Sequence, residues 1–212
     1  MIAVFGARAD VGVTTVAGSL ARAFRSLGSK QVALVEVDAR AVRARSASPT
    51  GDVLPPVADA ERFELPGLNA ALIPQHDGVW TTVLMRPRTP AMGDAKGVTV
   101  ALEAIRGRFP VSIVELEHQV NERTLAAFDA ADRIVLVTEG AVPSLRGTQR
   151  VLRLCQRLNY PDEKMCVVLN RAGAPGSLPV EDVSAALRRE IYWRIAYGHV
   201  TTTGLAERLL TD

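Results

Sequence analysis

A chain of 212 residues with a formal net charge of +2 is long enough for one domain with a full core. That charge creates no overall field that would require nucleic acid or a membrane as partner. Hydrophobic residues make up 48% of the chain, which excludes intrinsic disorder. No apolar run approaches the ~18 residues of a membrane span, and residues 2–5 lack the basic flank of a signal peptide. Cys155 and Cys166 have no metal-ligand spacing, so we expect core thiols in a reducing, cytoplasmic compartment.

The first elements form a strand, a loop, a helix and a second strand. Residues 2–5 are uniformly apolar, as in a strand that is buried on both faces. Residues 16–27 repeat apolar side chains at helical spacing, and residues 31–37 predict a second strand that closes on Asp38. Together they make a βαβ unit, whose two strands are parallel and whose crossover is right-handed.

The rest of the chain continues to alternate between strands and helices. Further strands are expected at 68–73, 111–116, 133–138, 164–169 and 191–195. Further helices are expected at 98–108, from 121 on, and at 143–158, 180–189 and 202–210. The proline-rich residues 39–66 predict an irregular excursion with a short helix at 57–63, and residues 80–85 fit either a strand or a loop. The alternation predicts an α/β fold: a doubly wound, mostly parallel sheet with helices on both faces, in a single domain over 1–212.

The loop between the first strand and the first helix has the position of a phosphate-binding P-loop but not its chemistry. A P-loop reads G-x-x-x-x-G-K-[ST], whereas residues 7–14 read Ala-Arg-Ala-Asp-Val-Gly-Val-Thr. Gly12 and Thr14 fit the motif. Ala7 replaces the first glycine, and Val13 replaces the lysine that would reach the β- and γ-phosphates. The sequence therefore predicts a nucleotide site with degraded phosphate chemistry.

Read together, these motifs resemble the MinD/ParA group of P-loop ATPases over essentially the whole chain. That group carries a deviant loop, K-G-G-x-G-K-[ST], whose positions are taken here by Arg8, Ala9, Asp10, Val11, Gly12, Val13 and Thr14, followed by Thr15. The resemblance implies Asp38 as the acid after the second strand and Glu115 at the Walker B aspartate position. It also implies Asn170, with Arg171 beside it, where relatives meet adenine. Thr14 and Asp38 would hold magnesium only if Mg-ATP binds.

Within this group the chain is similar to the CpaE/TadZ branch, whose proteins take part in Flp-type (tight-adherence) pilus assembly. The similarity lies in the wording and order of residues 125–139, 143–146 and 158–164. It implies partners among the proteins of a pilus or secretion machine, which would recruit a cytoplasmic protein to the inner membrane face or a cell pole. Many relatives carry a receiver-like domain before the ATPase domain, and none is expected here. The amphipathic extension with which MinD reaches the membrane is missing after 202–210, so we expect only indirect membrane contact.

The altered loop favours a pseudo-ATPase as the function. Val13 offers no charge-assisted donor, Ala7 restricts the backbone, and Asp10 brings a like charge toward phosphate. We therefore expect no enzymatic turnover, and either no cofactor or weakly bound ATP with magnesium. The fold would serve as a dimerising scaffold or localisation factor for a surface machine such as a Flp-type pilus. Relatives pair through the P-loop face, so Arg8 and Asp10 would lie at a homodimer interface.

Two alternative functions stay open. In the first, the protein is a divergent but functional ATPase in which Arg8 takes over the phosphate contact. In the second, it is a ParA-like non-specific DNA-binding protein, because four arginines recur along one helix face: Arg146, Arg150, Arg153 and Arg157. A solvated helix face explains these arginines more simply, so DNA is not expected as a partner.

Overall fold

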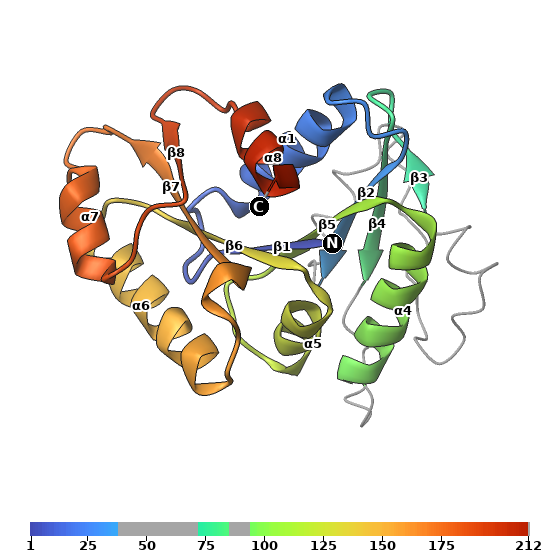
Figure 1. The fold of residues 1–212 in the computed structure, drawn as a ribbon, viewed down its shortest axis with the longest axis horizontal. Coiled ribbons are helices and arrows are strands. Elements are labelled where there is room, and N and C mark those ends of the chain that lie inside the picture. The colour runs from blue at the N-terminus through green and yellow to red at the C-terminus, as the bar shows by residue number, and fades with distance from the viewer. Residues whose placement is uncertain (38–71, 85–93, 212) are drawn as a thin grey trace.

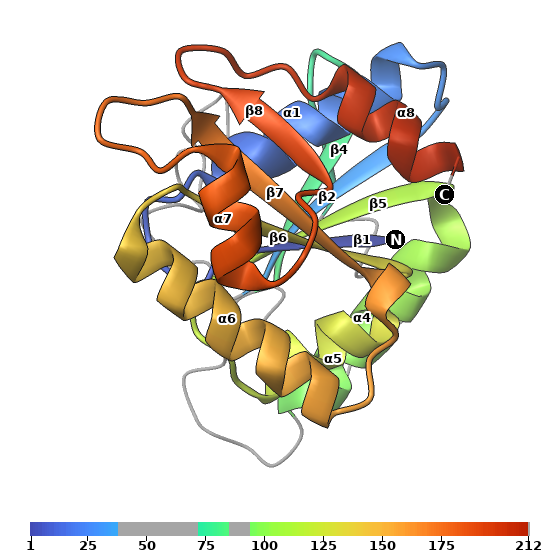
Figure 2. The ribbon, with the colours of Figure 1, turned by 60° about the vertical axis from the view of Figure 1, so that its left-hand side comes forward.

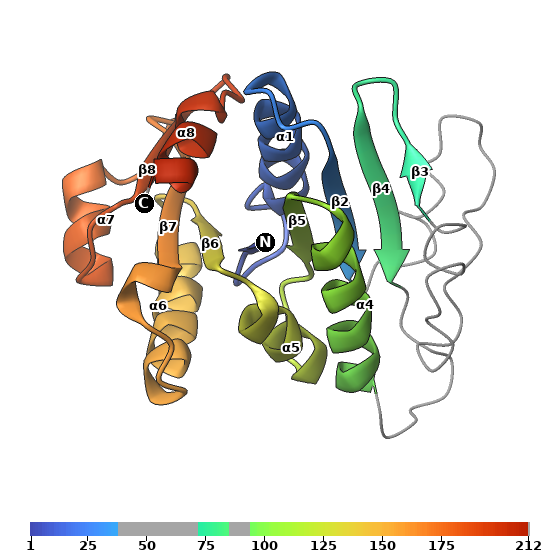
Figure 3. The ribbon, with the colours of Figure 1, turned by 45° about the vertical axis from the view of Figure 1, so that its right-hand side comes forward.

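The computed structural model describes residues 1–37, 72–84 and 94–211, and its centre is an eight-stranded sheet (Figure 1). The strands are β1 (Ile2–Phe5), β2 (Val32–Val37), β3 (Ile73–Pro74), β4 (Val79–Leu84), β5 (Val111–Leu116), β6 (Arg133–Thr138), β7 (Met165–Ala172) and β8 (Trp193–Ala196). Their order is β3-β4-β2-β5-β1-β6-β7-β8, and every neighbouring pair is parallel except β3 and β4. Figure 3 shows this sheet from β3 at one edge to β8 at the other.

Helices cover both faces of the sheet. They are α1 (Val13–Ser26), α4 (Asp94–Arg108), α5 (Glu122–Ala130), α6 (Val142–Arg157), α7 (Val180–Leu187) and α8 (Thr203–Thr211), with a 3-10 turn, η2 (Asp162–Lys164), before β7. Helices α1 and α8 lie on one face, and α4, α5 and α6 lie on the other (Figures 1 and 2). This architecture confirms the predicted doubly wound, mostly parallel α/β fold. Within the described part of the chain, no helix is long and apolar enough to cross a bilayer.

The uniformly apolar strands form in the centre because each face must bury side chains. All four residues of β1 are buried between β5 and β6. Ala3 and Phe5 face the core under α4, α5 and α6, where the Phe5 ring meets Phe128 edge-on at 5.5 Å between centroids. On the other face, α1 buries Val16, Leu20 and Phe24, which recur every four residues and so form one helical stripe.

The region around residues 68–85 differs from the expected order. Residues 80–84 of the segment 80–85, for which a strand and a loop were both possible, belong to β4, which pairs in parallel with β2. Of the strand expected at 68–73, only residues 72 and 73 lie in the described part, and Ile73 begins the two-residue β3, which runs antiparallel at the sheet edge. Pro74 is tolerated there because an edge strand can spare an N–H donor. The excursion 39–66, its helix at 57–63, and Asp38 lie outside the described residues.

The loop after β1 begins at the point where the sheet order turns. The chain runs from β1 through α1 to β2, which lies on one side of β1 beyond β5. The later strands β6, β7 and β8 lie on the other side of β1. In doubly wound sheets, ligands bind beyond the carboxyl ends of the strands at such a switch point. The fold therefore places residues 6–12 where a ligand site is expected.

Candidate functional site

The loop between β1 and α1 is held by one glycine and one buried amide. Gly12 has φ of 93°, and α1 begins at the next residue. The Asn170 side chain, at the end of β7, donates from Nδ2 to the Val11 carbonyl at 2.9 Å. A Cβ on residue 12 would lie 2.3 Å from that same Nδ2, so glycine and Asn170 require each other. Asp10 also adopts a left-handed conformation, with φ of 66°, which aspartate tolerates better than most residues.

A cleft of about 600 Å³ opens above this loop at the carboxyl edge of the sheet. It is lined by Arg8, Ala9, Asp10, Gly12, Val13, Thr14, Thr15, Glu115, Leu116, Glu117, His118 and Arg171. The fold thus brings together most of the residues that the sequence predicted for a nucleotide site.

Val13 keeps the lysine position of the motif apolar. Its side chain is half-buried and packs against the core cluster under α1. A Cβ on Gly6 would lie 2.7 Å from Val13 Cγ2 and 2.5 Å from Val11 Cγ2, so both valines pack over the Gly6 backbone. The N-terminus of α1 still faces the cleft and favours negative charge through its backbone dipoles. No cationic side chain at position 13 reinforces that preference.

Thr14 and Glu115 meet across the cleft, as expected for the magnesium side of such a site. The Thr14 hydroxyl donates to Glu115 Oε1, and Glu115 is only 5% exposed at the end of β5. Hydroxyl and carboxylate oxygens are ligands that Mg²⁺ accepts. Asp38, the other acid expected here, lies outside the described residues.

Arg171 is tied to the protein around it. Its guanidinium donates to the Asp10 carbonyl at 3.1 Å and forms an ion pair with Glu139, which follows β6. Arg171 has φ of 54° within β7, where the pairing with β8 shifts register between Leu169 and Ala172. Its charge is shared with Glu139, whereas Arg8, on the loop itself, is exposed at the cleft.

Asn170 supports the loop from beneath its backbone. It is 7% exposed and is not part of the cleft lining, and its contact with adenine stays a prediction. Its amide holds the loop in this structure, a role that the family resemblance did not indicate.

Two supporting residues were missed by sequence reasoning. Glu139 comes directly after a buried strand, as Asp38 does in the sequence, and that pattern is a signal that could have identified it. Gly147 lies in α6 opposite the loop, and a Cβ there would lie 3.0 Å from the Ala7 Cβ. Nothing in the sequence indicates which of the chain's glycines allows this close approach.

The residues fit magnesium better than they fit a triphosphate. Thr14 and Glu115 supply oxygen ligands, but the cleft holds no lysine at position 13. Asp10 and Glu117 add negative charge to the lining, and like charges disfavour a polyphosphate. Among the residues that the structure describes, the donor set is therefore incomplete for ATP.

Comparisons with known proteins give matches to solved structures. Neither the models of known protein families nor the curated proteins match this chain. MinD from Aquifex aeolicus superimposes with a TM-score of 0.76 at 21% identity, covering 100% of this chain and 97% of that one. The MinC:MinD complex from the same organism gives 0.78 at 19% identity, with 100% and 95% covered. Cobyrinic acid a,c-diamide synthase from Mycobacterium smegmatis, with bound ADP and magnesium, gives 0.73 at 21% identity, with 100% and 91% covered.

Superpositions of this quality, at such low sequence identity, establish the fold alone. The similar structures include MinD with Mg-ADP from Pyrococcus horikoshii and a ParA family ATPase from Chlorobium tepidum, both covering 92% of this chain. In the present chain, the same architecture places the altered loop at the carboxyl edge of the sheet. The chain therefore has the fold of the MinD/ParA-type P-loop NTPases.

Proposed function

We propose that this protein is a MinD/ParA-like pseudo-ATPase, a scaffold whose nucleotide site has lost hydrolysis. The observation that carries the proposal is Val13, which packs against the core where the motif requires a lysine. Arg171 does not replace that lysine freely, because its guanidinium is shared between Glu139 and the Asp10 carbonyl. The cleft keeps its shape while its phosphate-binding charge is reduced.

The size of the loss is enough to matter. A charge-assisted hydrogen bond contributes about 1.5–3 kcal/mol, and each 1.4 kcal/mol changes a dissociation constant about tenfold. Removing the lysine alone would therefore weaken a micromolar ATP site by roughly ten- to a hundredfold. The negative charge of Asp10 acts in the same direction, although its exposure to water screens it.

Calorimetric titration with Mg-ATP, paired with a phosphate-release assay, tests this proposal. We expect no saturable binding in the micromolar range and no turnover above buffer. The Val13→Lys variant should bind at least tenfold more tightly, whereas the matched Val13→Leu variant should behave as the wild type. Micromolar binding by the wild type, with hydrolysis that disappears in Thr14→Ala, would overturn the proposal.

The scaffold would act as a homodimer that meets further proteins, and Flp-type pilus components are our proposed partners. The carboxyl edge supports this proposal because apolar side chains are exposed in segments that follow β5 and β6: Val120, before α5, is 37% exposed and Val142, at the start of α6, is 51% exposed. The MinD structure solved together with MinC is a fold relative in complex with a partner protein. Such partners would place this protein at the inner membrane face or a cell pole.

Sedimentation equilibrium without nucleotide tests the dimer. We expect a concentration-dependent dimer that Arg8→Glu weakens, because Arg8 lies on the exposed loop that would face the second copy. Arg22→Glu, on the exposed surface of α1, is the matched charge reversal and should leave the dimer unchanged. A wild type that stays monomeric at every concentration would refute the dimer without touching the claim about ATP.

A divergent, functional ATPase remains a second candidate, supported by one observation. Arg8 is exposed in the lining of the cleft, and within the described parts of the chain it forms no ion pair that would occupy its charge. If Arg8 contacts phosphate, Arg8→Ala should abolish ATP binding and Arg8→Lys should retain part of it. Identical titrations for the wild type and Arg8→Ala would remove this candidate.

A further inference from the structure

A second groove lies between α6 and α7, which are neighbours in Figures 1 and 2. Its volume is about 610 Å³. It is lined by Gln149, Leu152, Arg153, Gln156, Asp162, Ala185, Ala186, Leu187, Arg188 and Arg189. The groove shares no lining residue with the cleft above the loop.

The chemistry of the groove is cationic. Helix α6 carries four arginines and no acidic residue along its 16 positions. Three arginines line the groove against the single carboxylate of Asp162. Arg189 pairs with that carboxylate at 2.9 Å and also donates to the Met165 carbonyl at 3.2 Å. The remaining charges belong to Arg153 and Arg188.

These two arginines are exposed on opposite walls. Arg153 belongs to α6, and Arg188 ends α7 in a left-handed conformation with φ of 50°. Among the residues that the structure describes, neither guanidinium forms an ion pair. A planar guanidinium binds carboxylates through two parallel hydrogen bonds, so two such groups facing one groove suit an acidic ligand.

The groove is mainly polar, with a smaller apolar floor and a fixed width. Leu152 is half-buried, Leu187 is 7% exposed, and both line the groove together with alanines of α7. The Gln149 side chain donates to the Ala186 carbonyl and so links the two helices directly. The lining positions of α6, from residue 149 to 156, extend over about 10 Å at ~1.5 Å per residue. An extended peptide covers that length with about three residues at ~3.3 Å each.

We propose that this groove binds a short acidic segment of a partner protein in which acidic and apolar residues alternate. Carboxylates would pair with Arg153 and Arg188, while an apolar side chain between them would pack on Leu152 and Leu187. Alternation suits an extended segment, because successive side chains point to opposite faces. Nucleic acid is disfavoured as the occupant: its backbone offers phosphates but no aliphatic side chain for the apolar part of the groove. This docking site stands independently of the nucleotide proposal, because the two sites share no residue.

Fluorescence polarisation with labelled synthetic peptides tests the site. The probes are a decapeptide of alternating glutamate and leucine, a decapeptide of alternating glutamate and serine with the same charge, and a labelled DNA duplex. We expect the Glu-Leu peptide to bind at least tenfold more tightly than the Glu-Ser peptide. Arg153→Glu should weaken that binding at least tenfold. Arg188→Asn should weaken it several-fold while keeping a residue that accepts the left-handed backbone.

The controls separate the groove from general charge attraction. Arg22→Glu, on α1 across the sheet, changes the net charge as Arg153→Glu does and should leave peptide binding unchanged. Circular dichroism melts verify that each variant remains folded. Equal affinity for both peptides, binding of DNA but not of the Glu-Leu peptide, or an equal effect of Arg22→Glu would each overturn the proposal.

Discussion

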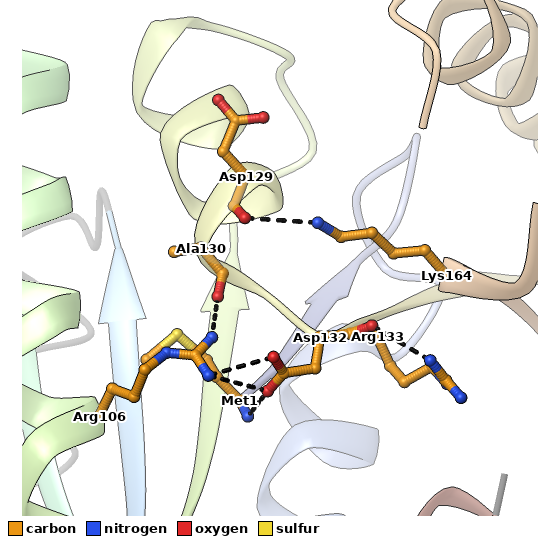
Figure 4. Close-up of polar contacts among 7 residues, drawn as sticks. All are labelled: Met1, Arg106, Asp129, Ala130, Asp132, Arg133 and Lys164. Carbon is orange, nitrogen blue, oxygen red and sulfur yellow. Dashed lines mark hydrogen bonds and ion pairs between the residues drawn. The ribbon is translucent and has the colours of Figure 1, made fainter. Parts of the chain in front are cut away.

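The two edges of the sheet use their charged residues in different ways. At the amino edge, charges pair with one another: Asp132 accepts from the N-terminal ammonium of Met1 and from Arg106 at 3.1 Å, and Arg106 also donates to the Ala130 carbonyl (Figure 4). At the carboxyl edge, Arg171 pairs with Glu139, but polar groups also hold the backbone of the loop before α1. Asn170 and Arg171 both donate to carbonyls of the loop before α1.

This difference separates stability from function within one sheet. At the amino edge, these contacts link the C-terminal parts of α4 and α5 to the start of β6. A ligand could bind these charged groups only by breaking the contacts. At the carboxyl edge, polar groups fix the shape of a loop, and the side chains of Arg8 and Asp10 stay exposed. Substitutions at the two edges should therefore have different effects. Those at the carboxyl edge should change the geometry of the loop, and those at the amino edge should change stability in acid.

The largest effect is expected from Gly12→Ala. Alanine would have to adopt φ of 93° and place its Cβ 2.3 Å from Asn170 Nδ2. The left-handed backbone costs about 1–2 kcal/mol, and displacing the buried amide costs about 1–3 kcal/mol. We expect the free energy of unfolding, measured by urea denaturation, to fall by about 2–5 kcal/mol.

Gly18→Ala is the matched control for this change. Gly18 lies in the middle of α1, and its added Cβ would meet Arg22 at 3.6 Å, an ordinary contact. Alanine is the better helix former, so this variant should be more stable by up to about 1 kcal/mol. Equal stabilities for the two alanine variants would show that the loop does not depend on Gly12.

Asn170→Ala should have the next largest effect and should act on the loop. It removes the donor to the Val11 carbonyl, a buried bond, at a cost of about 1–3 kcal/mol. Hydrogen exchange should accelerate in residues 9–13. Asn121→Ala is the matched asparagine control: it removes the cap of α5, where Asn121 Oδ1 accepts from Thr124 N, at a cost of about 1 kcal/mol. Unchanged exchange in the loop of Asn170→Ala would contradict the proposed support role.

The buried parts of the fold were predictable because their periodicity is strong. The run 2–5 and the helical stripe of α1 were both identified, since a fully buried strand and an amphipathic helix leave clear patterns. β4 stayed ambiguous because Thr81 and Thr82 interrupt its apolar run, although β-branched residues suit a strand. Its antiparallel neighbour β3 has only two residues, too few for any periodic signal.

The candidate site was predictable in position but not in contacts. The P-loop spacing and the family resemblance located residues 8–15, and the resemblance located Glu115 and Arg171, which lie near the ends of two parallel strands. The inward packing of Val13 and the bond from Asn170 to Val11 depend on distances between segments far apart in the chain. Sequence spacing does not encode such distances. The family resemblance gave Asn170 a contact with a ligand and did not indicate its bond to the loop.

At the amino edge, Asp132→Asn should produce a smaller effect that depends on acid. Burial raises the pKa of Asp132, but the N-terminal ammonium and Arg106 lower it more, so the net pKa falls below its usual 3.8. The stabilisation is therefore present above pH 3.8 and is lost as pH falls through the lower folded value. Because the carboxylate is 57% exposed, we expect a loss of at most about 1 kcal/mol at neutral pH.

Thermal melts from pH 2 to pH 7 check this prediction, with Asp162→Asn as the control. Asp162 also pairs with an arginine, Arg189, but is 90% exposed, so its loss should be smaller. The difference between wild type and Asp132→Asn should shrink as pH falls through the lowered pKa of Asp132, toward zero at the acid end of the range. A difference that persists at the acid end would indicate that the asparagine disturbs packing instead of removing charge pairs.

The smallest effect on stability is expected from Tyr160→Phe, at the same edge. The Tyr160 hydroxyl donates to Asp129, and its ring meets Phe128 edge-on at 6.2 Å. The variant keeps the ring contact, so the loss should be about 0.5 kcal/mol at neutral pH. Burial first, and then the bond to Asp129 and its charge, raise the pKa of Tyr160 above 10.0. This bond is therefore fully present below pH 10 and is lost only as pH rises through the higher folded value.

Alkaline titration of tyrosinate absorbance measures this shift directly. The chain has three tyrosines, and the step that belongs to Tyr160 should lie above the usual pKa of 10.0. Tyr160→Phe should remove that late step, and Asp129→Asn should move it to lower pH because the carboxylate charge is gone. If Asp129→Asn leaves the late step in place, burial alone holds the proton. The paired charges of the amino edge would then contribute less to its stability than the comparison with the carboxyl edge implies.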